Sequence, residues 1–421
     1  MTSTPTTPTT PTTPTPTTTG TTGTTAVRIP APHSAGCPFG PPPAYTDAAA
    51  TAAVTRADLP GGESCWLATG YAEVRTVLSD RRFSADARHP DFPLLVPGSR
   101  EIIAANPSFL RLDDPEHARL RRMVTGDFLV KRVEAMRPAV QRIVDEALDG
   151  MTLGRTEADL VADFALPVPS LVICLLLGVP YEDREFFQAV SRTLLSSDNT
   201  LEKLFEAQQE LLDYLSALAA RKREQPEDDI LSRLAVRDDL TAHDVASTGL
   251  LLLIAGHETT ANMISLSTAL LLDRPDQVAR LADPAALPGA VEELLRHLTI
   301  VHTGLPRVAL EDVQLGATTI RAGEGVIAMI STANRDEAVF GDADRRPADE
   351  LDLDRDARRH MAFGFGVHQC LGQPLARAEL QIALATLFRR LPGLRLAVPR
   401  AELAFRTESF IHGMRSLPVT W

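Results

Sequence analysis

The chain has 421 residues, of which 44% are hydrophobic and 23% are charged, a composition typical of globular proteins. Its formal net charge of −13 argues against a nucleic-acid-binding function, because such proteins usually carry a basic surface. The four cysteines are scattered without a Cys-x-x-Cys pair, which argues against a disulfide framework and against a zinc site of the usual spacing.

The N-terminal segment is almost entirely threonine and proline from residue 2 to residue 25. Such a segment cannot bury apolar surface, so we predict a disordered tail over residues 1–30 and a single domain over 31–421. No stretch reaches the roughly 18 apolar residues that span a bilayer, and no basic segment followed by an apolar core begins the chain. We therefore expect a cytoplasmic protein without a membrane anchor.

The elements expected next are short strands and proline-rich loops, with one strand over 64–69. From about residue 113, apolar residues recur at helical spacing. Successive helices are predicted over 117–128, 136–151, 181–196, 201–225, 241–272, 289–298 and 376–391. Strand-like segments gather in the C-terminal third, over 308–320, 323–330, 394–399 and 416–421. The predicted fold class is mainly α, of the α+β kind, with small peripheral sheets.

Two helical motifs place charged residues at contact spacing. His117 and Arg121 stand four residues apart and share one face of a helix. Two donor groups at this spacing can bind a dianionic group, although a solvated basic face has the same pattern. Glu293 and Arg296 are three residues apart, and by spacing alone they are an ordinary helix ion pair.

The segment AGHETT, residues 255–260, lies in the middle of the apolar helix predicted over 241–272. Ala255 and Thr259 share a face, and the Thr259 hydroxyl can bond to the Ala255 carbonyl. A buried Glu258 is costly unless it has a partner or a chemical task. The segment is therefore either a proton relay, with Thr259 bonding to dioxygen, or a satisfied polar patch in a core helix.

Cys370 lies in the segment FGFGVHQCLG, residues 363–372, among three glycines and shortly before a predicted helix. Backbone amides in a glycine-rich loop and the positive end of a helix lower the pKa of a thiol, so the arrangement suits a thiolate. A thiolate held in this way can be an axial ligand of haem iron, and the alternative is a buried structural cysteine.

Together these segments resemble the motifs of the cytochrome P450 family. Residues 363–372 match its haem-binding signature F-G-x-G-x-H-x-C-x-G, AGHETT matches A-G-x-[DE]-T-T, and Glu293 with Arg296 matches E-x-x-R. The resemblance runs from about residue 37 to residue 421 and implies the cytochrome P450 fold with a haem b cofactor. A closer likeness, carried by AGHETTANMISLSTALLL, LTIVHTGLPRVALEDV and the LPVTW ending, is to the actinobacterial branch that oxidises polyketides and foreign drugs.

The resemblance implies a role for each matching residue. The iron ligand would be Cys370, and the proton-handling pair would be Glu258 and Thr259. The remaining haem contacts would be His117, Arg121, Arg307, Phe363, His368 and Gly372. A buried network that serves stability and haem loading would contain Glu293, Arg296 and Arg355. The substrate would contact Leu94, Val96, Leu252, Ala255, Val301, His302, Phe410 and Ile411.

The implied activity is that of a haem-thiolate monooxygenase, which hydroxylates or epoxidises a small apolar molecule using O2 and two electrons. The expected substrate is a macrolide or other polyketide of antibiotic biosynthesis, or a foreign compound. No G-x-G-x-x-G follows a predicted strand, so a separate ferredoxin and an NAD(P)H-dependent ferredoxin reductase would supply the electrons to a monomer. Two alternatives stay open. One is other haem chemistry on the same fold, such as peroxide-driven oxidation or nitric-oxide reduction, and the other is a non-catalytic haem binder.

Overall fold

The computed structural model describes residues 26–34, 39–105, 108–341, 346–407 and 409–421. The first 25 residues of the disordered tail predicted over residues 1–30 lie outside the described residues, and so does Cys37. The packed chain begins before the boundary predicted at residue 30, because β1 (Val27–Arg28) pairs in parallel with β2 (Val54–Asp58). The segment that follows β1 is therefore part of the fold.

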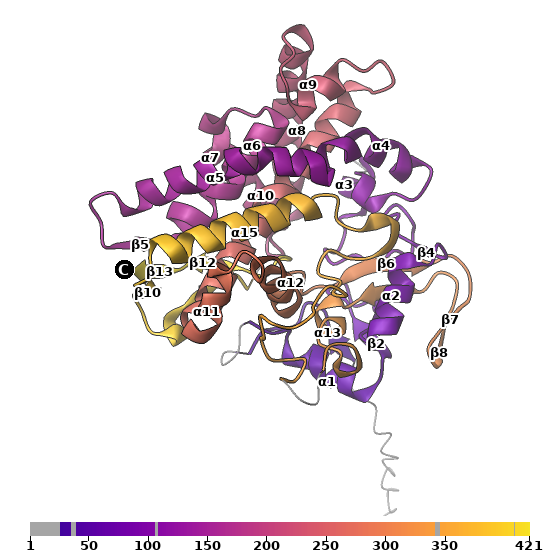
Figure 1. Ribbon diagram of the computed structural model, residues 1–421. Coiled ribbons are helices and arrows are strands. Elements are labelled where there is room, and N and C mark those ends of the chain that lie inside the picture. The colour runs from indigo at the N-terminus through magenta and orange to yellow at the C-terminus, as the bar shows by residue number, and fades with distance from the viewer. Residues whose placement is uncertain (1–25, 35–38, 106–107, 342–345, 408) are drawn as a thin grey trace, which may run out of the picture.

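Helix α10 (Ala242–Leu272) runs through the helical half of the molecule (Figure 1). It begins at a capping box, in which the Thr241 hydroxyl accepts a hydrogen bond from the Asp244 amide and the Asp244 carboxylate accepts one from the Thr241 amide. Apolar residues cover most of its circumference, so other helices surround it. The helices that pack against it include α6 (Pro167–Leu177), α8 (Leu201–Glu224) and α15 (Gln373–Arg390).

The other long helices also occur where the sequence predicts them. The helix expected over 117–128 is α4 (Glu116–Thr125) with a short 3-10 turn after it, and the helix expected over 136–151 lies within α5 (Val130–Thr152). The remaining helices of this half and its border are α7 (Arg184–Leu195), α9 (Ile230–Ala235), α11 (Pro275–Ala282) and α12 (Leu287–Leu298).

The strands form small sheets around the helices (Figure 1). The largest has six strands in the order β1-β2-β3-β9-β6-β4. Its pairing of β3 (Ser64–Ala68) with β9 (Gly325–Ala328) joins the N-terminal part of the chain to the segment after α12. The other strands are β4 (Phe83–Ser84), β5 (Glu157–Asp159), β6 (Leu305–Ala309), β7 (Val313–Leu315), β8 (Thr318–Ile320), β10 (Arg395–Leu396), β11 (Ala404–Phe405), β12 (Met414–Ser416) and β13 (Pro418–Thr420).

The apolar core has two main parts. The larger lies among the helices, where side chains such as Phe164 and Leu253 are completely buried, and the smaller covers the largest sheet. Short helices pack near this sheet, namely α1 (Pro43–Thr51), α2 (Tyr71–Ser79), α3 (Arg100–Ala105), α13 (Ile330–Ala333) and α14 (Glu337–Phe340). The predicted fold class, helix-rich α+β with small peripheral sheets, is confirmed. Among the described residues, no helix has an apolar stretch long enough to cross a membrane.

Candidate functional site

The loop that carries Cys370 is closed tightly just before α15. The Cys370 amide donates a hydrogen bond of 2.8 Å to the Phe363 carbonyl. Gly364 and Gly366 have φ angles of +71° and +76°, a left-handed backbone that glycine adopts without strain. A Cβ atom on Gly366 would collide with the carbonyl oxygen of Leu78, so glycine allows the loop to approach α2 closely. The loop conformation therefore requires both glycines.

Burial by itself raises the pKa of the Cys370 thiol. Hydrogen bonds from the Gly372 and Gln373 amides and the charges of Arg121 and Arg377 lower this pKa, but they do not outweigh burial. The predicted lowering by the loop and the helix end is therefore present, and burial opposes it. A metal cation bound to sulfur deprotonates a thiol outright, so the expected thiolate depends on the iron as well as on the loop.

Cys370 and part of α10 have accessible side chains in otherwise buried surroundings. The Cys370 side chain is accessible, although the surrounding protein is dense enough for burial to raise its pKa. Ala255 is also exposed, although α10 is mostly buried. Leu251 and Thr259 are partly accessible and lie one turn to either side of Ala255. These three residues therefore form an accessible row along one face of α10.

Four basic residues that were predicted to contact the haem converge in the structure, namely His117, Arg121, Arg307 and His368. The rings of His117 and His368 lie 4.1 Å apart between centroids. Burial, together with Arg307, His117 and Arg121, lowers the pKa of His368 to about 3. Arg121 also donates a hydrogen bond of 2.5 Å to the carbonyl of Gln369, in the cysteine loop. Helix α4, strand β6 and the cysteine loop thus contribute to one basic cluster.

Arg111 belongs to the same cluster and was not predicted from the sequence. Burial lowers the pKa of Arg111 to about 10, and burial with repulsion from Arg111 lowers the pKa of Arg307 to about 10. Across the described ranges, neither guanidinium lies within ion-pair distance of a carboxylate. Buried cations without a partner are costly, so the cluster suits an anionic ligand. The only signal in the sequence is that Arg111 precedes the His117 motif by a few residues.

Glu258 has a partner that sequence spacing could not identify. The carboxylate is buried at 1% exposure, and its Oε2 atom lies 2.7 Å from Nη1 of Arg406, which is 148 residues away in the sequence. The other oxygen, Oε1, is buried and has no hydrogen-bond partner in the described part of the chain. The predicted bond from the Thr259 hydroxyl to the Ala255 carbonyl is confirmed at 2.7 Å.

Glu293, Arg296 and Arg355 form one buried network, as the sequence predicts. Arg296 Nε lies 2.6 Å from Glu293 Oε2, and Arg355 Nε lies 3.4 Å from Glu293 Oε1. The Glu293 and Arg296 side chains are both fully buried. Arg296 Nη1 also donates to the carbonyls of Asn334 and Ala348, at 2.7 and 2.6 Å. The network therefore links α12 to the irregular segment that precedes the cysteine loop.

The predicted substrate contacts divide into accessible and buried groups. Ala255 is exposed, and Leu94, Val96 and Val301 are partly accessible. Leu252 lies in the main core at 7% exposure, so the accessible row of α10 passes through Leu251 instead.

The remaining predicted contacts lie near the C-terminal hairpin, which the antiparallel strands β11 and β12 form. His302 is buried at 5% exposure, and its ring stacks on His412. Phe410 and Ile411 are partly accessible, and the Phe410 amide donates a 3.1 Å hydrogen bond to the Leu195 carbonyl at the end of α7. His302 therefore contacts other histidines, whereas Phe410 and Ile411 keep accessible surface.

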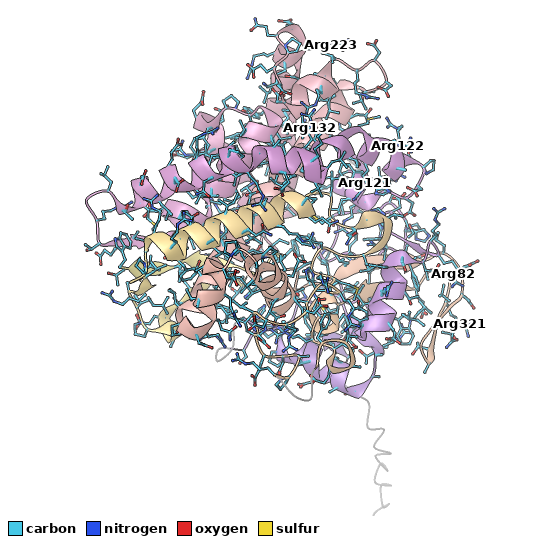
Figure 2. The ribbon with its side chains drawn as sticks, in the orientation of Figure 1. Arg82, Arg121, Arg122, Arg132, Arg223 and Arg321 are labelled. Carbon is cyan, nitrogen blue, oxygen red and sulfur yellow. The ribbon has the colours of Figure 1, made fainter. Side chains whose placement is uncertain are left out.

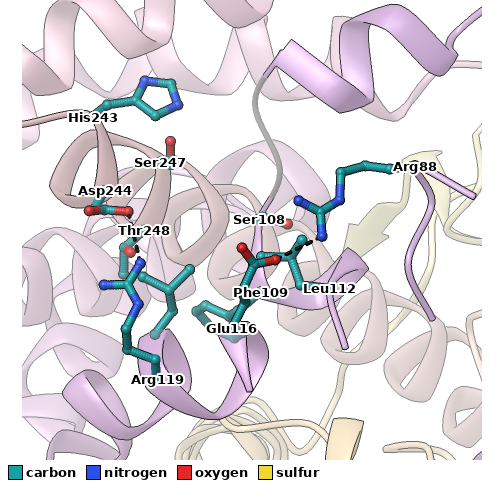
Figure 3. A pocket seen from close by; sticks show the side chains of 11 residues that line it. Arg88, Ser108, Phe109, Leu112, Glu116, Arg119, His243, Asp244, Ser247 and Thr248 are labelled. Carbon is teal, nitrogen blue, oxygen red and sulfur yellow. Dashed lines mark hydrogen bonds and ion pairs between the residues drawn. The ribbon is translucent and has the colours of Figure 1, made fainter. Parts of the chain in front are cut away.

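Two pockets open beside the N-terminal end of α10, and neither is lined by Cys370. One encloses about 120 Å³ between α4 and α10 (Figure 3). Two ion pairs join residues that line this pocket, Arg88–Glu116 at 2.7 Å and Arg119–Asp244 at 3.6 Å. The other encloses about 250 Å³ between α3 and α8, and His243 lines both. Cys370 therefore lies outside both pockets.

Comparison with known proteins gives consistent matches along the chain. The family described as Cytochrome P450 matches residues 60–284 and 285–392. Cytochrome P450-SU2 of Streptomyces griseolus is 62% identical over 397 residues, which cover 94% of this chain and 97% of that protein. Pentalenic acid synthase of Streptomyces avermitilis is 49% identical, with coverage of 93% and 96%. The crystal structure of a mycinamicin VIII methyl hydroxylase from Micromonospora griseorubida, bound to mycinamicin VIII, matches with a TM-score of 0.87 at 39% identity and covers 94% of this chain and 100% of its own.

Proposed function

This chain belongs to the cytochrome P450 family, and we propose that it hydroxylates or epoxidises a polyketide natural product or a foreign organic compound. As a cytochrome P450 monooxygenase, it binds haem b through a cysteine thiolate and acts on a small molecule with O2 and electrons from redox partners. The observation that carries the proposal is the accessible Cys370 side chain beside the basic cluster, where Arg121 donates to the carbonyl of the neighbouring Gln369.

The basic cluster fits the two carboxylates of a haem. His117 Nε2 is buried without a hydrogen-bond partner among the described residues. Arg111 and Arg307 are desolvated cations without a carboxylate partner there. The haem propionates would satisfy these groups, and Arg121 and His368 would extend the same contact surface. When bound, haem supplies the iron centre at which dioxygen is activated.

The side of the site around Cys370 fits the cysteine face of a haem. Gly372 leaves the sulfur approachable, since even a Cβ atom there would lie 4.0 Å from Cys370 Sγ. Phe363 lies in the same loop, and the guanidinium of Arg377 is 4.7 Å from the centroid of its ring. We infer that Cys370 is the iron ligand and that Phe363 limits the access of water to the sulfur.

Glu258 and Thr259 are suited to move protons toward the accessible face of α10. Oε1 of Glu258 is buried and has no protein hydrogen bond within the described ranges, so it is available to accept and release a proton. Arg406 holds the opposite oxygen and keeps the carboxylate oriented. The Thr259 hydroxyl lies in the accessible row, where it can pass on a proton when its bond to the Ala255 carbonyl is exchanged. This intact pair favours oxygen-dependent chemistry over peroxide-driven oxidation, nitric-oxide reduction or non-catalytic haem binding.

Glu258→Gln is expected to lower oxygen-driven turnover by about 100-fold, because a general acid of this kind contributes at least that much. Arg406→Gln should cause a smaller loss of about 10-fold and a larger solvent deuterium isotope effect, and Arg406→Lys should restore most of the rate. Turnover is measured with a ferredoxin and reductase system, next to peroxide-driven turnover of the same variants. An equal loss in the peroxide assay would contradict a role in proton delivery.

The substrate class is proposed from the pocket wall and from the relatives. Leu251 and Ala255 give α10 an apolar accessible row, and Leu94, Val96 and Val301 are partly accessible apolar residues of other segments, as in most ligand pockets. The mycinamicin VIII methyl hydroxylase is bound to mycinamicin VIII in its crystal structure, and a second relative is named pentalenic acid synthase. These features support a macrolide or other polyketide of secondary metabolism as substrate, with a foreign drug as the second candidate.

The substrate proposal is tested with a panel of macrolides, other polyketides and foreign drugs. At least one compound should shift the ferric haem from low to high spin and give a product heavier by one oxygen atom. Ala255→Leu should weaken that compound's binding, while Leu310→Ala, at an exposed position, should leave it unchanged. A panel without any spin shift or oxygenated product would refute the proposed substrate class.

A ferredoxin with an acidic surface is the proposed electron donor of a monomeric enzyme in the cytoplasm. Arg122 is exposed on α4, on the same helix as Arg121 of the basic cluster (Figure 2). Within the described residues, Arg122 has no ion-pair partner, whereas Arg119 is paired with Asp244. The free thiols of Cys65 and Cys174 are consistent with a reducing compartment.

A further inference from the structure

Three histidines outside the proposed haem site and proton path gather where three distant segments meet. His33 follows β1, His302 follows α12, and His412 precedes β12. One ring nitrogen of each lies within 4.8 Å of those of the other two. His302 and His412 are buried at 5% and 3% exposure, and His33 is half-buried.

We propose that His33, His302 and His412 form a binding site for one divalent transition-metal ion, of the class of Zn²⁺, Ni²⁺ or Cu²⁺. A set of imidazoles suits these borderline metals, whereas Mg²⁺ and Ca²⁺ prefer oxygen ligands. Three histidines with a water molecule in the fourth position are a recurrent arrangement around zinc. The site would be independent of the haem, because none of its ligands belongs to the cysteine loop or to the basic cluster.

His302 is already oriented as a metal ligand. Its Nε2 atom lies 3.0 Å from the carbonyl oxygen of Leu298, so this nitrogen carries the proton and Nδ1 presents a lone pair. Metal-binding histidines usually donate their second ring N–H to a carbonyl in this way. Nδ1 of His302 accepts a hydrogen bond from Nε2 of His33, and the two nitrogens lie 3.1 Å apart. This is close to the separation of about 3.3 Å between two nitrogens bound to one tetrahedral zinc ion.

The surroundings keep the rings in the state that binds a metal. Burial lowers the pKa of His33, and burial with the neighbouring histidines lowers the pKa of His302 well below its usual value. Both rings are therefore neutral at pH 7, as a metal ligand must be. A metal ion would replace the proton that His33 Nε2 shares with His302 Nδ1, and His33 can carry that proton on its Nδ1 atom instead.

Metal binding requires two of the rings to turn. The rings of His33 and His412 are stacked with centroids 4.1 Å apart, and those of His302 and His412 are stacked at 4.6 Å. Because a nitrogen lone pair lies in the ring plane, His33 and His412 must rotate about their Cβ–Cγ bonds to point at a common centre. Histidine tolerates a broad range of this torsion, and the three nitrogens already lie within 4.8 Å of one another.

A metal ion at this position would fasten the N-terminal segment to the C-terminal hairpin. The His412 amide already donates a 2.8 Å hydrogen bond to the Ile300 carbonyl, in the loop that carries His302. The same hairpin carries Arg406, the partner of Glu258, and Ile411, a proposed substrate contact. Metal binding would therefore stiffen one side of the proposed substrate pocket.

The test uses the full-length, haem-loaded protein after treatment with EDTA and dialysis, with zinc chloride as the probe. Competition against a chromophoric zinc chelator should give one zinc ion per haem. X-ray absorption at the zinc edge, which the haem iron does not obscure, should show a first shell of imidazole nitrogens. Absence of stoichiometric binding, or a first shell without imidazole, would overturn the proposal.

Variants at the site and away from it complete the test. His412→Phe, which can still stack on Phe405, should weaken zinc binding by at least about 100-fold, because even outer-shell changes cost 10- to 100-fold. His33→Gln provides a second variant, and haem content with the carbon-monoxide spectrum checks the folding of both. His243→Gln, at an exposed histidine in the first turn of α10, should bind zinc like the wild type. Wild-type affinity in either folded site variant would refute the assignment.

Discussion

Cys370→His is expected to abolish oxygen-dependent product formation and to remove the far-red Soret band of the reduced, carbon-monoxide-bound protein. A thiolate pushes electron density to the iron and favours O–O cleavage, whereas an imidazole ligand does not. The variant should still bind haem, because Arg307 and the other basic residues of the propionate cluster are unchanged. The measurement is the difference spectrum of the variant beside the wild type, followed by turnover with a ferredoxin system.

The matched controls are the two other described cysteines. Burial raises the pKa of Cys65 and of Cys174 to about 12, so both thiols stay neutral and are packing residues. Cys65→Ala and Cys174→Ala should keep the far-red band and most of the activity, with at most a loss of stability. Retention of the band by Cys370→His, or its loss in one of the controls, would refute the assignment of Cys370 as the ligand.

Arg296→Ala is expected to lower the free energy of unfolding by about 3–5 kcal/mol and to prevent stable haem loading. The substitution leaves the fully buried Glu293 carboxylate with the longer 3.4 Å contact to Arg355 and a 3.0 Å hydrogen bond from the Asp352 amide. It also leaves the buried carbonyls of Asn334 and Ala348 without their donor. The loss is a large part of the about 5–15 kcal/mol that stabilises a typical domain. Urea unfolding and the haem-to-protein ratio measure the two effects.

The matched control for Arg296→Ala is an arginine in an exposed ion pair. Arg280 lies 2.5 Å from Asp354, and both side chains are about half exposed. Arg280→Ala should change the free energy of unfolding by less than about 1 kcal/mol and leave haem loading intact, because water screens such pairs. Similar losses in the two variants would show that the buried network has no special role in stability.

The helices could be predicted from the sequence because their signals are local. Helix α10 shows this most clearly, with a capping box at Thr241 and Asp244 and an apolar surface up to Leu272. The strands were located less completely, since short strands such as β5 depend on a partner from another part of the chain. The fold family itself followed from the motifs around Cys370, Glu258 and Glu293 rather than from periodicity.

The candidate site could be predicted only where a motif or local spacing marks a residue. The bond between Thr259 and Ala255 follows from helical spacing, and the structure contains it. The convergence of His117, Arg307 and His368 rested on the family resemblance, because these residues lie on three separate elements. Their roles toward haem, like those of the proposed substrate contacts, stay predictions that the variants above test.

The sequence by itself determined the helices, the cysteine loop and the pair of Glu258 and Thr259. Each of these depends on residues that lie close together in the sequence. Only the tertiary structure decided which groups meet across long stretches of chain. Arg406 reaches Glu258 from 148 residues away, and His33 reaches His302 and His412 from the other end of the chain. The tertiary structure also decided how deeply Cys370 is buried. This burial raises the pKa of the thiol, whereas the hydrogen bonds of its own loop lower it. Sequence neighbours could not predict the burial effect, because desolvation depends on all the surrounding atoms.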